Sequence, residues 1–343
     1  MAFEALAVLW FVILAIFLAG YAVLDGFDLG VGILHPFLAR NDHERRVFLN
    51  AIGPIWDGNE VWLIVYGGAL FAAFPEAYAT IFSGFYTAFM VVLLALILRA
   101  VSIEFRSKMH TRGWRRFWDI GFFVGSLLAA LVFGVAVGNG MRGVPLDHRG
   151  VFVGSFLDLL NPYALLVGLF TVSMFAMHGA IFLHLKSPSG PLRDRLRRWM
   201  WHTWGLFLVL YMLTTIYTLT SFPRATANFE RFPWAAGIVV LNVLAIANVP
   251  RSVYAERPGQ AFLSSAASIM GFVALFSLAL YPDLVPARND PAYSLTIFNA
   301  ASSAKTLTIM AIIAAIGAPL VLTYTALAYW TFRGEVRLSE HGY

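Results

Sequence analysis

Long runs of apolar residues follow one another along this chain, separated by short segments that carry most of its charge. A helix needs about 20 mainly apolar residues to cross the hydrocarbon core of a bilayer. Within each run the apolar residues are continuous and do not alternate with polar ones, which predicts helices and not the strands of a membrane barrel. Nine runs are expected to span the membrane: residues 6–34, 59–75, 77–98, 117–139, 161–185, 202–221, 234–250, 261–281 and 306–331.

The composition agrees with this pattern. Hydrophobic residues make up 59% of the chain and charged residues 13%, whereas soluble domains carry about 25% charged residues. The chain lacks the polar surface needed to face water, so we interpret residues 1–343 as one all-α integral membrane domain. The first run starts without a basic segment or a small-residue cleavage site, and we expect it to be retained as a helix. The absence of cysteine excludes disulfides and thiolate-bound metals.

The distribution of Lys and Arg predicts the orientation in the membrane. Of the 24 basic residues, 18 fall in the odd-numbered loops and the C-terminal segment. These segments should face the cytoplasm, which leaves the N-terminus outside. Because the net charge of +5 comes from such loops, no nucleic-acid partner is expected.

With this orientation, spans 1–4 (about 6–139) cross the membrane in the same sequence of directions as spans 5–8 (about 161–281), and span 9 (about 306–331) is left over. This parity allows two related four-helix halves.

Two aspartates interrupt the first span, in the stretch GYAVLDGFDLGVGILHPF. Asp25 and Asp28 are three residues apart and share one face of a helix. A carboxylate in the hydrocarbon core costs about 3 kcal/mol even on the mildest scales. The aspartates are therefore either hydrated at the interface or buried and functional. Gly26, Gly30 and Gly32 would let neighbouring helices approach this segment closely.

A second acidic stretch, PIWDGNEVW, begins the second span. Trp56, Asp57 and Glu60 would lie at its cytoplasmic entry, where acids in the first helical turn are favoured by the helix dipole. Asp57 could therefore be a helix cap and the tryptophan part of an interfacial belt. Alternatively, these acids join the two aspartates of the first span in a carboxylate cluster on one side of the membrane.

Arg99, at the predicted end of the third span, is the cation closest to this cluster. It is either an ordinary residue that extends its charge to the interface or the counter-ion that keeps one of the carboxylates ionised. Four acids beside one cation leave at least one acid able to bind and release protons. The pattern thus indicates a proton-entry cluster.

The eight histidines do not predict a haem or metal site in this chain. His178 and His184 lie six positions apart on the fifth span and face different directions. We therefore expect His178 to be a hydrogen-bonded residue of the bundle and not a haem ligand. No metal site, phosphate-binding loop or nucleophile–base pair is recognisable. On these features alone, a stand-alone proton-coupled transporter ranks first, and a membrane chaperone is a further alternative.

Several motifs together resemble subunit II of the cytochrome bd-type quinol oxidases, a family that includes cyanide-insensitive oxidases. The resemblance is dense over residues 20–145 and thinner over 190–290. It is carried by the segments LDGFDLGVG, WDGNEVWLI, FSGFYTAF, RSKMHTRGWRRFWDIGFFVGS, VAVGNGMRGVP, NPYALLVGL and ASSAKTLTIM.

The resemblance implies nine transmembrane helices, arranged as two four-helix bundles plus a peripheral ninth helix, in the bacterial cytoplasmic membrane. It also implies a heterodimer with a larger subunit I, which would supply the haem ligands, for haem b and haem d or for b-type haems only, and the quinol site. It leaves open whether small single-helix accessory subunits attach, whether a structural quinone lies in this chain, and which quinol is used.

The implied activity is electrogenic oxidation of quinol and reduction of O2 to water, without a pumping step. No catalytic residue is expected in this chain, which would contribute a path for cytoplasmic protons. The residues implied for that path are Asp57, Trp56, Asp25, Asp28, Glu60 and Arg99.

Overall fold

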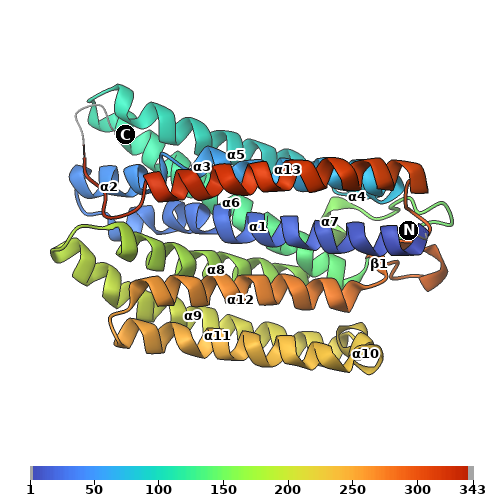
Figure 1. Ribbon diagram of the computed structural model, residues 1–343. Helices are drawn as coiled ribbons and strands as arrows, with labels where there is room; N and C mark the ends of the chain where they lie inside the picture. Colours follow the sequence, from blue (N-terminus) through green and yellow to red (C-terminus); the bar gives the residue numbers. More distant parts are fainter. Residues whose placement is uncertain (1–2, 339–343) are drawn as a thin grey trace.

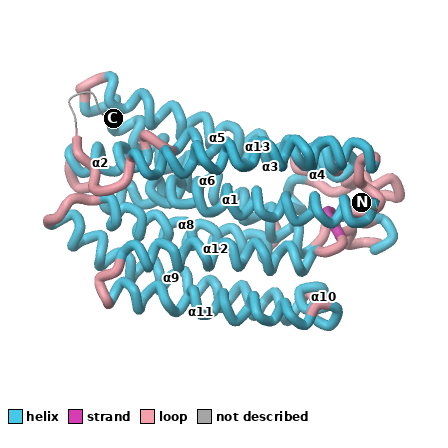
Figure 2. The backbone as a smooth tube through the Cα atoms, in the orientation of Figure 1, coloured by secondary structure: helices cyan, strands magenta, loops and turns pink. Residues whose placement is uncertain are grey.

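The computed structural model describes residues 3–338, so the first two and last five residues of the expected domain lie outside the described part. Long helices lie side by side along one direction, and the connecting segments gather at the two ends of the molecule (Figures 1 and 2). In chain order the helices are α1 (Phe3–Leu38), α2 (Asp42–Ile52), α3 (Trp56–Ala73), α4 (Pro75–Gly84), α5 (Tyr86–Phe105), α6 (Arg112–Arg142), α7 (Phe156–Leu159), α8 (Pro162–Lys186), α9 (Pro191–Ser221), α10 (Arg224–Arg231), α11 (Ala236–Tyr254), α12 (Pro258–Leu280) and α13 (Ala304–Thr331). Short 3-10 helices occupy Arg106–Lys108, Pro233–Ala235 and Pro291–Tyr293, and β1 (Asp283–Val285) pairs antiparallel with β2 (Leu295–Thr296).

The all-α membrane class expected from the sequence is confirmed. Eight helices of the described chain are long and apolar enough to cross a membrane: α1, α5, α6, α8, α9, α11, α12 and α13. The remaining expected span, residues 59–75, corresponds to α3. This helix starts with the polar stretch WDGNE, which shortens its apolar part.

The third span differs from its expected bounds of 77–98. The chain forms α4, bends at Phe85, and continues as α5 to Phe105. Arg99 therefore lies inside a helix and not at its end, because its charge is paired within the protein. The sixth span likewise starts at Pro191 and not near residue 202, since the basic stretch PLRDRLRRWMWH is itself the first part of α9.

Several helix starts follow from local sequence signals. Asn41 caps α2 by accepting a hydrogen bond from the backbone N–H of Glu44, and Asn161 caps α8 in the same way through Ala164. Pro162 then occupies the first turn of α8, where its missing N–H costs nothing. Ser303 caps α13. Such side chains satisfy N–H groups that have no partner within the helix.

Helix α1 lies at the centre of the packing and contacts α3, α6, α8 and α12. The contacts repeat between the two halves: α1 packs on α3 as α8 packs on α9, and α5 packs on α6 as α11 packs on α12. The two first helices, α1 and α8, meet each other along the shared boundary. One continuous hydrophobic core runs through both halves.

Glycines bring α1 and α8 into backbone contact. A Cβ added at Gly30 would lie 1.9 Å from the carbonyl oxygen of Phe175, and one added at Gly179 would lie 2.5 Å from the carbonyl carbon of Gly30. On another side of α1, a Cβ at Gly32 would lie 2.0 Å from Oγ of Ser126 on α6. The glycines of LDGFDLGVG thus allow α1 to pack closely on two neighbours, as small residues do in membrane bundles.

Helix α13 lies on the outside of the bundle, and Leu307 is its one buried residue. It is joined to α1 where the indole nitrogen of Trp10 donates to the carbonyl of Leu307 (3.0 Å). Just before it, the backbone N–H of Ser302 donates to the carbonyl of Ala73 at the end of α3 (2.8 Å). These bonds hold α13 along α1 and α3.

Gly30→Ala is expected to lower the melting temperature (Tm) of the purified protein by several degrees, because α1 and α8 would have to separate to admit the new methyl group. Overpacking of this kind costs about 1–3 kcal/mol. The control is Gly67→Ala on α3, where an added Cβ meets nothing within 4 Å. Equal Tm values for the two variants would contradict the close packing of α1 on α8.

Candidate functional site

A buried ion pair joins α1 to α5 inside the bundle. Nη1 and Nη2 of Arg99 donate to the two carboxylate oxygens of Asp25, at 2.9 and 2.6 Å. Both side chains are fully buried. Bidentate contact of this kind is among the strongest hydrogen-bonded arrangements in proteins. Arg99 is thus a counter-ion of the carboxylate cluster and not a residue that extends to the interface.

Glu60 of α3 reaches the same guanidinium group. Its Oε2 lies 3.4 Å from Nη2 of Arg99, and its side chain is 20% exposed. Arg99 therefore lies between one carboxylate sealed inside the protein and another that still reaches the surface.

Asp28 has a different kind of partner. Its Oδ2 accepts a hydrogen bond from the side-chain amide of Asn59 (2.8 Å), and the carbonyl oxygen of that amide accepts one from the hydroxyl of Tyr329 on α13 (2.9 Å). Oδ1 of Asp28 is buried and has no hydrogen-bond partner among the described residues. Asp28 is thus a buried carboxyl group whose direct partner is neutral.

Asp57 and Trp56 lie at the first turn of α3. Asp57 is exposed, while Trp56 is half-buried against the hydrophobic core. Asp57 precedes Glu60 by three residues, so the two acids are neighbours on the helix surface. From Asp57 through Glu60 to Asp25, the carboxyl groups pass from exposed to fully buried.

The structure thus brings Asp25, Glu60 and Arg99 into direct contact. Asp28 is joined to α3, the helix of Glu60, through Asn59, and Asp57 lies at the surface. Two residues of the site, Asn59 and Tyr329, were not expected from the sequence. Asn59 lies inside the acidic motif and could have been noticed there. Tyr329 lies 270 positions further along the chain, and no sequence feature connects it to the site.

Tyr21, one helical turn before Asp25, is a further residue of the site that the sequence does not indicate. Its hydroxyl is buried, and the carboxylate of Asp25 is the charged group that acts on it most strongly. It lies on the first helix, as do Asp25 and Asp28. The polar face of α1 therefore extends over two turns.

His178 uses both ring nitrogens within the bundle. Nδ1 forms a hydrogen bond with Oγ of Ser265 (2.7 Å), and Nε2 one with the carbonyl of Val23 (3.2 Å). The ring also stacks on Phe262, with centroids 4.8 Å apart. This side chain has no nitrogen left to bind a haem iron. Within residues 3–338, no group of three or more His, Asp or Glu residues is arranged to hold a metal ion.

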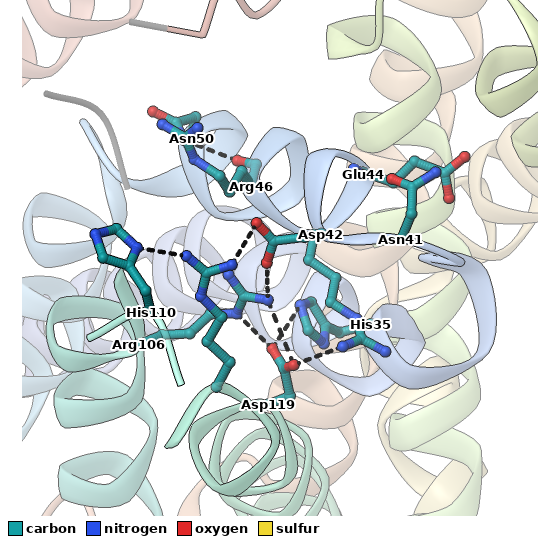
Figure 3. A network of polar contacts seen from close by, with 11 residues as sticks. His35, Asn41, Asp42, Glu44, Arg46, Asn50, Arg106, His110 and Asp119 are labelled. Atoms are coloured by element: carbon teal, nitrogen blue, oxygen red, sulfur yellow. Dashed lines mark hydrogen bonds and ion pairs between the residues drawn. The ribbon is translucent and has the colours of Figure 1, made fainter. Parts of the chain in front are cut away.

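A second polar network ties the short helix α2 to the bundle (Figure 3). Asp119 of α6 lies at its centre, 2.6 Å from Nε of Arg106, 2.9 Å from Nη1 of Arg45 and 3.5 Å from Nε2 of His35. None of these residues stands out in the sequence, because charges next to an apolar run are typical of ordinary loops. The network holds the segment that connects α1 to α3.

Asp42, the first residue of α2, bridges two arginines of this network. Its carboxylate lies 2.8 Å from Arg106 and 2.9 Å from Arg115. Partial burial acts to raise the pKa of Asp42, but the hydrogen bond and the charge of Arg106 outweigh it and hold the pKa below its ordinary value. Asp42 therefore stays ionised and in place at neutral pH.

The chain is similar to one family of respiratory proteins over nearly its whole length. The family model described as cytochrome bd terminal oxidase subunit II matches residues 6–332. Cytochrome bd-I ubiquinol oxidase subunit 2 of Escherichia coli (strain K12) is 36% identical over 364 residues, covering 97% of this chain and 96% of the relative. Cytochrome bd ubiquinol oxidase subunit 2 of Bacillus subtilis (strain 168) is 35% identical over 333 residues, covering 97% of each.

A solved structure shares the fold. The bd oxidase from Geobacillus thermodenitrificans contains a chain that matches with a TM-score of 0.80 and 18% sequence identity, covering 96% of this chain and 98% of that one. The arrangement of helices described above is therefore one already known from an oxidase.

Breaking the buried ion pair from either side is expected to destabilise the protein strongly. Arg99→Met would leave Asp25 as an unpaired buried charge, and Asp25→Asn would leave Arg99 with only its 3.4 Å contact to the partly exposed Glu60. Removing one partner of a buried pair costs about 3–5 kcal/mol. The double variant should lose less than the sum of the two, since neither charge then lacks its partner. Thermal unfolding checks this, with the exposed Arg116→Met as control. Additive losses would contradict direct coupling.

Asp42→Asn is expected to lower the free energy of unfolding at pH 7 by about 0.5–1 kcal/mol, measured as a lower Tm. The loss is small because the Asp42 side chain is 42% exposed and solvent screens its charge. A carboxyl group with a lowered pKa stabilises the fold above its unfolded pKa, about 3.9, and this contribution is lost as the pH falls through the folded pKa. The difference between wild type and variant should therefore be constant near neutral pH and shrink below about pH 4. A difference that grew toward acid pH would contradict the assignment.

Proposed function

The chain belongs to the family of cytochrome bd terminal oxidase subunits II, and from that premise we propose that its buried acidic site admits protons from the cytoplasm to the oxygen-reducing centre of the complex. The family is one of respiratory oxidoreductases in bacterial membranes that carry haem and work with a partner subunit I.

The single observation that supports this role is the way one cation serves two carboxylates. Arg99 is bound to the buried Asp25 and lies 3.4 Å from the partly exposed Glu60. When Glu60 takes up a proton from the side of Asp57, its attraction to Arg99 weakens, and the ion pair with Asp25 remains to neutralise the guanidinium. A proton can thus enter without leaving an uncompensated charge inside the protein.

Asp28 would be the next proton-holding group. It has a neutral amide as its direct partner and an oxygen without a partner. The hydroxyl of Tyr329 fixes the orientation of the Asn59 amide, so that the amide nitrogen faces Asp28 and the amide oxygen does not. Asp28 can exchange a proton at Oδ1 while Oδ2 stays bound to Asn59.

His178 of α8 does not fit the role of a haem ligand, because both its ring nitrogens are hydrogen-bonded within the bundle. We therefore propose that haem b and haem d, or b-type haems alone, are bound by subunit I, where they supply the electron transfer and the oxygen reduction. The residues of the present chain hold and move protons.

The proposed architecture has nine transmembrane helices, with α3 counted as one of them. They form two four-helix bundles related through the contact of α1 with α8, with α13 as the peripheral ninth helix. With the N-terminus outside, Asp57 faces the cytoplasm. Protons consumed from that side while quinol is oxidised near the outer face would make turnover electrogenic without a pumping step.

Asp57→Asn is expected to lower the quinol-dependent oxygen consumption of the purified complex about 10-fold or more, since proton transfer by a positioned group contributes at least this much. Subunit I should still co-purify, and the reduced-minus-oxidised haem spectrum should not change. Glu76→Gln is the matched control, because Glu76 is also an exposed acid in a first helical turn, that of α4 at the opposite end of the bundle.

Full turnover in a correctly assembled Asp57→Asn complex would remove Asp57 from the proposed path. A broader failure is also recognisable. A colourless single chain, purified gently from native membranes and active in proton-coupled transport, would replace the oxidase role with that of a transporter.

A further inference from the structure

A cavity of about 290 Å³ lies at the end of the bundle where α8 connects to α9 and α11 connects to α12. These connections lie at the same end of the molecule as α2 (Figure 1). The cavity is remote in the chain from every residue of the proton path. Three arginines line it, Arg193, Arg197 and Arg257, together with two carboxylates, Asp194 and Glu256.

Two long helices begin at this cavity. Gly190 and Arg193 belong to the start of α9, and Arg257 and Pro258 to the start of α12. Neither start has a side chain that caps its free N–H groups. The positive ends of two helix dipoles therefore add to the charge of the arginines.

The cavity wall also contains an unused polar atom. Nδ1 of His184 is buried and has no hydrogen-bond partner in the described part of the chain. Buried polar atoms without partners are uncommon in folded proteins, and this one belongs to a partly buried side chain of the cavity wall. This observation is independent of the two helix starts.

The arginines of the cavity form only exposed ion pairs with carboxylates, or none within the described residues. Arg197 pairs with Glu256 and Arg193 with Glu335, each at 2.7 Å, but the four side chains are between 28% and 70% exposed. Exposed pairs of this kind contribute at most about 1 kcal/mol. Within residues 3–338, Arg257 has no carboxylate at ion-pair distance.

We propose that this cavity binds a phosphate group, with Arg193, Arg197 and Arg257 as its charged donors. Guanidinium groups bind phosphate oxygens through paired hydrogen bonds, which are stronger than exposed contacts with carboxylates. The phosphate can belong to the headgroup of an anionic lipid or to a free anion. The apolar residues exposed on α9, such as Leu206 and Val209, would accept the acyl chains of a lipid.

The test uses the protein as purified from its native membranes and delipidated in a neutral detergent. Its Tm is measured with added phosphatidylglycerol, with diacylglycerol of the same chains, with inorganic phosphate, and with sodium chloride at equal ionic strength. Phosphatidylglycerol, phosphate or both should raise the Tm by roughly 2–4 °C, and diacylglycerol and chloride should not. A rise with phosphatidylglycerol alone identifies a lipid headgroup as the source, and a rise with inorganic phosphate shows that a free anion is sufficient.

Arg257→Gln should lose most of this rise, and Arg257→Lys, which keeps the charge, should retain part of it. Because Arg257 is exposed and has no ion pair with residues 3–338, the Tm without ligand should change little. The control Arg116→Gln removes an exposed arginine of α6 outside the cavity and should keep the full rise. The absence of any rise in the wild type, or an equal rise in Arg257→Gln, would overturn the proposal.

Discussion

The polar interior of this protein depends on the ion pair between Arg99 and Asp25. Removing two charges from water costs several kcal/mol per ion, and their attraction offsets this cost only when the geometry is good. The bidentate contact at 2.6 and 2.9 Å meets that condition. It also requires α1 and α5 to keep their relative position within a fraction of an ångström. Because Glu60 of α3 reaches the same guanidinium, the pair fixes the place of a third helix.

The opposite side of α1 meets a different requirement. There Gly30 allows the backbones of α1 and α8 to touch, which joins the two halves of the bundle through close packing and not through charge. A single motif, LDGFDLGVG, thus carries acids toward α3 and α5 and glycines toward α8 and α6. This explains why α1, a membrane helix, carries two aspartates whose burial costs free energy and also several glycines on its surface. The acids build the polar site, and the glycines hold that site in a rigid frame.

The sequence predicts most of the helices and most of the acidic site, and its errors have physical causes. Apolar runs locate helices well, because lipid accepts little else. They misplace an end where a charge is paired inside the protein, as Arg99 is within α5. Asp25 and Asp28 are predictable because a carboxylate in an apolar run is conspicuous. The roles of Tyr329 and of Asp119 are not, since each depends on a partner brought close only by folding.

The hydrogen bond from Tyr329 to Asn59 has a consequence for the order of biogenesis. Helix α13 leaves the ribosome after the twelve α-helices that precede it in the described chain, and almost all of its surface is exposed outside the bundle. During synthesis the earlier helices can insert and pack, while the amide of Asn59 is still free to rotate. Its orientation toward Asp28 becomes fixed only when α13 docks. An acidic motif near the start of the chain is therefore completed by a helix made some 270 residues later, and translation must pass α13 before the site has its mature form.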